Sequence, residues 1–116
     1  MITRKMVLAS LIFAGIMAAA GGVAGEWDNT ALTPDGEALK FILKVREEGG
    51  KLSGTADDRR GAMPLIEPKL EDSTLSFKLD YNGARYTLVL KISGDKLEGT
   101  YTGEAASGKI SGTRRR

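Results

Sequence analysis

The sequence predicts an all-β protein: an antiparallel, up-and-down eight-stranded barrel or strongly curled meander, preceded by an N-terminal signal helix. Three observations carry this prediction. Apolar and polar residues alternate with period two through most of residues 26–114, which gives each segment one buried face. Turn dipeptides such as Asn82-Gly83 separate the alternating segments. The first two dozen residues instead form a basic start followed by an apolar run.

Residues 1–24 are interpreted as a secretory signal peptide. Arg4 and Lys5 supply its positive start, and the run 6–20 carries no charge. Gly22-Val23-Ala24 fits the small-x-small rule for cleavage after residue 24. A membrane-spanning helix needs about 20 apolar residues, so cleavage is favoured over a retained anchor. The mature protein is therefore expected to be secreted or periplasmic, with no membrane anchor.

Cleavage after Ala20 is an alternative, because small residues also precede that bond. On the first interpretation, residues 25–116 form a single β-barrel domain. Removal of the signal takes two residues, Arg4 and Lys5, from the 17 basic ones, which leaves 15 basic against 15 acidic residues. A neutral mature chain gives no reason to expect nucleic acid as a partner.

The composition excludes several chemistries. The chain has no His, so it has no imidazole base, no Ser/His/Asp triad and no His-ligated metal. It has no Cys, so it has no disulfide, no thiol nucleophile and no zinc-thiolate site. No catalytic residue, metal site or cofactor is predicted, and the protein is not expected to be an enzyme.

The strands are expected at 26–32, 37–46, 50–56, 64–70, 74–81, 84–92, 96–102 and 107–114. The fourth strand contains Pro64 and Pro68, which cannot donate hydrogen bonds to a ladder. This strand is therefore expected to be irregular, or to form an edge or a seam.

Turn residues predict the register between strands. Asn82-Gly83 is a strong hairpin signal, and it places every opposing apolar pair on one face. A slip of one residue would expose that whole face, so turn and pattern agree. The expected pairs are Leu79 with Tyr86 and Phe77 with Leu88 across Asn82-Gly83, Leu90 with Gly99 across Gly94-Asp95, Val45 with Leu52 across Glu48-Gly49, and Leu70 with Leu75 across 71–73.

A short repeat recurs at 51–55, 96–100 and 109–113, in the form Lys, Leu or Ile, any residue, Gly, Thr. Alternation turns the aliphatic residue and the Gly inward. A Gly inside a strand marks a bend or a close approach by another group. Two interpretations remain open: the glycines let the sheet curl, or they line a ligand cavity.

Strand counting places Trp27 and Arg114 together. Both fall at the bottom of the barrel, and alternation turns both inward. A buried guanidinium without a partner is costly, so Arg114 is expected to lie over the Trp27 ring within about 6 Å of its centre. The longer connections, 57–63 and 103–106, gather at the top, where a mouth would lie.

The ends of the mature chain resemble a known pattern. Gly25-Glu26-Trp27 opens the first strand and Gly112-Thr113-Arg114 ends the last, as in the calycin pattern of lipocalins and related small barrels. The repeats and Thr33-Pro34-Asp35-Gly36 also look like a group of short secreted bacterial β-barrel proteins with no assigned activity. The resemblance implies that the Arg packs over the Trp and closes one end. The chain is shorter than a typical lipocalin and has no second or third lipocalin motif.

Two non-enzymatic functions compete. The first is a binding module that takes a small apolar or amphipathic ligand at the top mouth, with Arg59, Met63, Tyr81 and Tyr101 as candidate contacts. The alternative is a structural or protein-interaction module of the cell envelope, with a barrel filled by side chains and an envelope protein as partner. An open apolar cavity of roughly 300 Å³ or more at the top favours the first, and a filled barrel favours the second.

Overall fold

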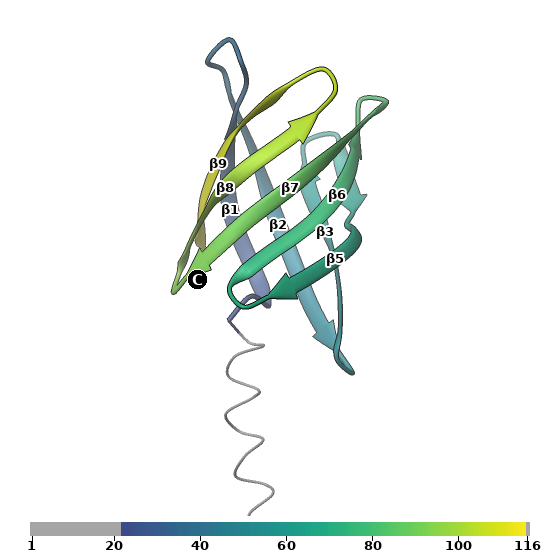
Figure 1. The fold of residues 1–116 in the computed structure, drawn as a ribbon, viewed down its shortest axis with the longest axis vertical. Helices are drawn as coiled ribbons and strands as arrows, with labels where there is room; N and C mark the ends of the chain where they lie inside the picture. Colours follow the sequence, from purple (N-terminus) through teal and green to yellow (C-terminus); the bar gives the residue numbers. More distant parts are fainter. Residues whose placement is uncertain (1–21, 116) are drawn as a thin grey trace, which may run out of the picture.

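The computed structural model describes residues 22–115, so the expected signal helix and Arg116 lie outside the described residues. The described chain is all-β and forms a nearly closed antiparallel barrel (Figure 1). Among residues 22–115, no helix is long and apolar enough to cross a membrane. The strands are β1 (Gly25–Leu32), β2 (Ala38–Glu48), β3 (Lys51–Asp58), β4 (Gly61–Pro64), β5 (Ile66–Glu71), β6 (Thr74–Tyr81), β7 (Ala84–Ser93), β8 (Lys96–Gly103) and β9 (Ser107–Arg114).

Neighbouring strands pair in the order β4-β3-β2-β1-β9-β8-β7-β6-β5. The chain therefore runs up and down around the barrel, and β1 pairs with β9 to join its two ends. The sheet stops at β4 on one side and at β5 on the other, which leaves a single seam between them. Figure 1 shows the consecutive strands winding around a common interior.

The expected eight strands are nine, because the fourth expected strand, 64–70, is broken. Leu65 separates β4, which pairs with β3, from β5, which pairs with β6. The break follows from the two prolines and from Glu67, which has a positive φ of 52° and lies where the β5–β6 register shifts. Leu65 N donates to Gly54 O of β3 at 3.0 Å, which extends the β3–β4 pairing by one residue before the chain crosses to β5 at the other edge of the sheet. The prediction that this segment forms a seam is confirmed.

The predicted register is confirmed at three hairpins and wrong at one. The pairs Leu79–Tyr86, Phe77–Leu88, Leu90–Gly99 and Leu70–Leu75 are all present. At the β2–β3 hairpin, however, Val45 pairs with Gly54 rather than with Leu52. The turn there is Gly49-Gly50, with φ angles of 60° and 84°, and two adjacent glycines with positive φ suit a tight two-residue hairpin turn. The shift is two residues, so the inward face is kept.

The repeated glycines allow neighbouring groups to approach closely. A Cβ on Gly54 would lie 1.9 Å from Lys44 O, and one on Gly99 would lie 1.8 Å from Val89 O. A Cβ on Gly112 would lie 1.9 Å from Asn29 Oδ1. No Cβ fits at such distances, so these three positions require glycine. The close approach that glycine allows lets the sheet curl.

The tightest packing lies in the lower half of the barrel, at the end that holds the two chain termini of the described region. The largest side chains there are fully buried: Trp27, Leu43, Leu75, Phe77, Leu90 and Leu97. Val23, which precedes β1, is also in this core with 1% of its surface exposed. The upper half differs, because Leu39, on the same face of β2 as Leu43, lines the cavity and is 40% exposed at the rim.

Candidate functional site

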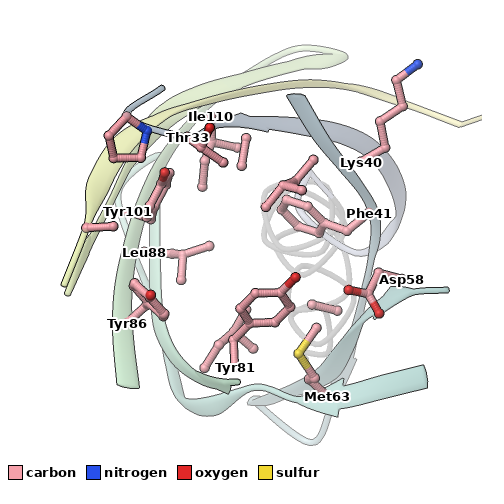
Figure 2. Close-up of a pocket in the computed structure, with 16 residues that line it drawn as sticks. Thr33, Lys40, Phe41, Asp58, Met63, Tyr81, Tyr86, Leu88, Tyr101 and Ile110 are labelled. Carbon is pink, nitrogen blue, oxygen red and sulfur yellow. The ribbon is translucent and has the colours of Figure 1, made fainter. Parts of the chain in front are cut away.

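The upper half of the barrel contains a cavity of about 230 Å³ that opens at the top (Figure 2). Its walls come from the upper ends of β1, β2, β3, β6, β7, β8 and β9 and from the start of β4. Among the lining side chains are Ala31, Phe41, Ala56, Leu79, Leu88 and Ile110. The surface of the cavity is almost wholly apolar, which suits a ligand with a hydrophobic body.

Three of the four residues predicted at the mouth line this cavity. They are Met63, Tyr81 and Tyr101, and they come from β4, β6 and β8. Arg59 does not line it and is exposed in the β3–β4 turn. Lys40 on β2 is the cationic residue among those that line the cavity. The residue after Arg59, Arg60, lies beside the cavity at the rim, with its guanidinium carbon 5.1 Å from the centre of the Tyr81 ring.

Arg60 also connects two loops at the rim. Its guanidinium donates a hydrogen bond to Asn82 Oδ1 in the β6–β7 turn, and its backbone N–H donates to Asp58 Oδ1 at 2.8 Å. These two bonds hold the guanidinium over the Tyr81 ring, on the side of the barrel where the seam between β4 and β5 lies. Sequence reasoning missed Arg60 because alternation does not specify which residue of a turn points back to the barrel.

The tyrosines of the cavity differ in their hydrogen bonds. Tyr101 donates its hydroxyl to Leu32 O at 2.6 Å and meets the Tyr86 ring edge-on, with ring centres 5.9 Å apart. Burial, followed by the proximity of Tyr86 and Asp35, raises the pKa of Tyr101. Tyr101 is therefore part of the wall, and its hydroxyl is already used.

Tyr81 presents a free hydroxyl to the cavity. Its side chain points inward, and its hydroxyl lies toward the middle of the cavity opposite Phe41 (Figure 2). Within residues 22–115 this hydroxyl has no hydrogen-bond partner from the protein. A buried or half-buried phenol favours a partner for its hydroxyl, so Tyr81 can bond a polar atom of a ligand.

The space in the cavity comes from two small inward residues. Ala31 on β1 and Ala56 on β3 are 9% and 0% exposed, and both line the cavity. On β1 the same inward face carries Trp27 four residues before Ala31. On β2 the residue that pairs with Ala56 is Leu43. Alternation applied to alanines would have found them, but small residues give a weak signal in a hydrophobic pattern.

The bottom of the barrel is closed. The guanidinium carbon of Arg114 lies 4.3 Å from the centre of the Trp27 ring, within the distance predicted from the sequence. Arg114 Nε donates to Asp95 Oδ1 at 3.1 Å, and Trp27 itself has no exposed surface. A ligand therefore cannot enter through this end of the barrel.

The structure offers no metal centre within the described part of the chain, where no group of three or more Asp and Glu side chains converges. Asp58 is the one carboxylate that lines the upper cavity. Paired-carboxylate chemistry needs two such groups flanking a substrate. Most of the cavity wall is hydrophobic, and its polar side chains are Thr33, Lys40, Asp58 and three tyrosines.

No protein-family model and no curated protein matches the chain. Solved structures with similar folds are small β-barrels. A redesigned barrel, b11L5F_LGL, is 14% identical with a TM-score of 0.61, covering 84% of this chain and 95% of that one. The redesigned barrel mFAP1, bound to DFHBI, is 15% identical with a TM-score of 0.60, covering 84% and 98%.

A fluorescent protein gives a similar result. A mutant of the fluorescent protein UnaG is 14% identical with a TM-score of 0.53, covering 84% of this chain and 99% of that one. At these identities the likeness is one of fold. It supports the β-barrel that the alternation of the sequence predicts, with nearly the whole length of each neighbour matched.

Proposed function

We propose that the protein is an exported, non-enzymatic barrel of the calycin type that binds one small apolar or amphipathic ligand at its upper mouth. The observation that carries this proposal is the apolar cavity of about 230 Å³, open at the top and closed below by Trp27 and Arg114. Export rests on the basic start, the uncharged run 6–20 and the small residues that follow.

The size of the cavity limits the ligand. A cavity of about 150 Å³ lined by aliphatic residues is enough to bind benzene, whereas pockets for drug-sized ligands measure about 300–1,000 Å³. The observed volume of 230 Å³ is smaller than the roughly 300 Å³ expected from the sequence for a binding module. The ligand is therefore small, with one or two rings or a short chain inside the barrel.

The polar groups suggest how such a ligand is oriented. The Tyr81 hydroxyl can bond a polar atom near the middle of the cavity, and Arg60 lies at the rim above it. An amphipathic ligand would place its apolar end against Leu88 and Ile110 and its polar end toward Tyr81 and the solvent. Two barrels of similar fold are bound to DFHBI, a small ligand, which is consistent with this use of the fold.

The alternative, an envelope interaction module, requires a barrel filled by side chains. That condition holds in the lower half, where six large side chains are fully buried. It does not hold in the upper half, where Ala31 and Ala56 leave space. We therefore prefer the binding module.

A fluorescence titration tests the proposal. N-phenyl-1-naphthylamine, a neutral probe that brightens in apolar surroundings, should bind the wild type saturably with one site, with its two-ring naphthyl group inside the cavity and its phenyl ring at the mouth. Ala31→Leu places extra methyl groups in the cavity and should weaken binding at least 10-fold. Ala62→Leu, the same change at an exposed residue of β4, is the matched control and should bind as the wild type does. Equal binding by all three proteins, or no saturable binding, would contradict the proposal.

A further inference from the structure

The three small residues before β1 form part of the barrel floor. Val23 is 1% exposed and belongs to the same hydrophobic core as Trp27 and Leu43. These residues, Gly22-Val23-Ala24, also fit the sequence pattern for cleavage after Ala24. One short segment thus has two incompatible assignments, part of the folded core or the end of a removed signal.

The backbone of this segment supplies the acceptors that the floor needs. Trp27 Nε1 donates to Val23 O at 3.0 Å, and Arg114 Nη1 donates to Ala24 O at 2.9 Å. Arg114 Nη2 donates to Gly22 O. Three N–H groups of the predicted closure therefore bond to carbonyls upstream of Gly25.

Cleavage after Ala24 would damage the floor in two ways. It would remove Val23 from the core and leave the buried Trp27 indole N–H without its acceptor, and an unpaired buried donor is costly. The part-buried Arg114 Nη1 and the more exposed Nη2 would also lose their bonds to Ala24 O and Gly22 O. It would also create an α-ammonium at Gly25. Gly25 lies against Arg114, since a Cβ there would be 3.1 Å from Arg114 Nη1. The new positive charge would face the guanidinium at short range, and like charges repel.

We propose that the leader is removed at the bond after Ala20, and that Gly22-Val23-Ala24 remain in the mature protein as a plug under Trp27. Ala18 and Ala20 satisfy the small-x-small rule for this bond. The inference rests on the proposed export of the protein. It assigns a processing site and a structural use for the residues that follow it.

The intact mass of the protein tests this assignment after export of the full chain from a bacterial host. The mass should correspond to residues 21–116. A mass corresponding to residues 25–116 would overturn the processing site while leaving export in place. A mass that retains Met1 would overturn both.

A matched pair of variants separates the two candidate bonds. Leu before the cut is too large for an A-x-A-like site, so Ala20→Leu should block or displace processing. Ala24→Leu should be processed as the wild type is, with only the mass of the substitution added. The reverse pattern, with Ala24→Leu blocked and Ala20→Leu unaffected, would contradict the proposal.

The single tryptophan of the chain gives a second readout. With the plug retained, Trp27 is shielded, so the exported protein should show blue-shifted emission that acrylamide quenches weakly. A chain that begins at Gly25 should show red-shifted emission and several-fold stronger quenching. Equal quenching of the two chains would mean that the segment does not shield the floor.

Discussion

The lower and upper halves of this barrel differ although the same strands build both. Leu43 and Leu39 lie on one face of β2, four residues apart, yet Leu43 is fully buried and Leu39 is 40% exposed. The lower half is closed by Trp27, Arg114 and the plug, whereas the upper half has alanines at inward positions. Alternation thus indicates which face is inward, and residue size along that face decides whether the interior is filled or open.

The largest expected difference between the halves is in stability. Leu43→Ala removes a fully buried side chain, so it should lower the free energy of unfolding by about 2–5 kcal/mol. Leu39→Ala, the same change on the same face at the rim, should cost less than about 1 kcal/mol because much of that surface is already in water. Urea unfolding of both variants measures the difference, and similar midpoints would contradict the contrast between the halves.

The next effect concerns the closure of the floor. Arg114→Ala removes the contact with Trp27, the ion pair with Asp95 and two bonds to the plug, and should cost about 1–3 kcal/mol. Arg115→Ala is the matched control. The Arg115 side chain forms exposed ion pairs with Glu26 and Asp28, and its backbone bond to Glu26 O survives the substitution, so the change should cost about 0–1 kcal/mol. Equal denaturation midpoints for both variants would argue against closure by Arg114.

A smaller effect is expected in the upper wall. Tyr101→Phe deletes the hydrogen bond to Leu32 O and should cost about 0.5–1.5 kcal/mol. Tyr81→Phe removes a hydroxyl that has no protein partner within residues 22–115, so its unfolding midpoint should stay near the wild-type value. Thermal unfolding followed by circular dichroism compares the two variants. A larger drop in the melting temperature of Tyr81→Phe than of Tyr101→Phe would contradict the hydrogen bonding described for the two hydroxyls.

The pH dependence of stability gives a further test of the Tyr101 environment. The folded state raises the pKa of Tyr101 above its ordinary value of 10.0, mainly through burial. Below pH 10 both states hold the proton, so this group gives no slope. Above pH 10 the unfolded state loses the proton first, and stability should fall as the pH rises. Tyr101→Phe should show a shallower fall than the wild type between pH 10 and 11, and parallel curves would contradict this origin.

The sequence predicts most of the framework because local signals agree there. Asn82-Gly83 and the alternation on both sides of it predict the β6–β7 register, and strand counting places Trp27 beside Arg114. The β2–β3 register failed because two turns, Glu48-Gly49 and Gly49-Gly50, both keep the apolar face inward. The structure adopts Gly49-Gly50, because a type I′ turn has positive φ at both central residues and Glu48 disfavours that conformation.

The site was harder to predict than the framework. Alternation placed Tyr81 and Tyr101 in the wall, but it could not tell that the Tyr101 hydroxyl is used by Leu32 O, a residue distant in sequence. Nor could it choose Arg60 over Arg59, since turn residues have no periodicity. The plug was missed for another reason: its small residues fit a cleavage rule, and their hydrogen bonds exist only once the barrel closes.

Methyl NMR during titration with N-phenyl-1-naphthylamine tests the central claim, that binding uses the open upper half alone. Methyl signals of Leu79, Leu88 and Ile110, which line the cavity, should shift progressively and saturate together. Those of Leu43 and Leu75 in the filled lower half should stay nearly unchanged. Shifts of equal size in both halves, or shifts confined to exposed methyl groups such as those of Val89, would contradict the claim.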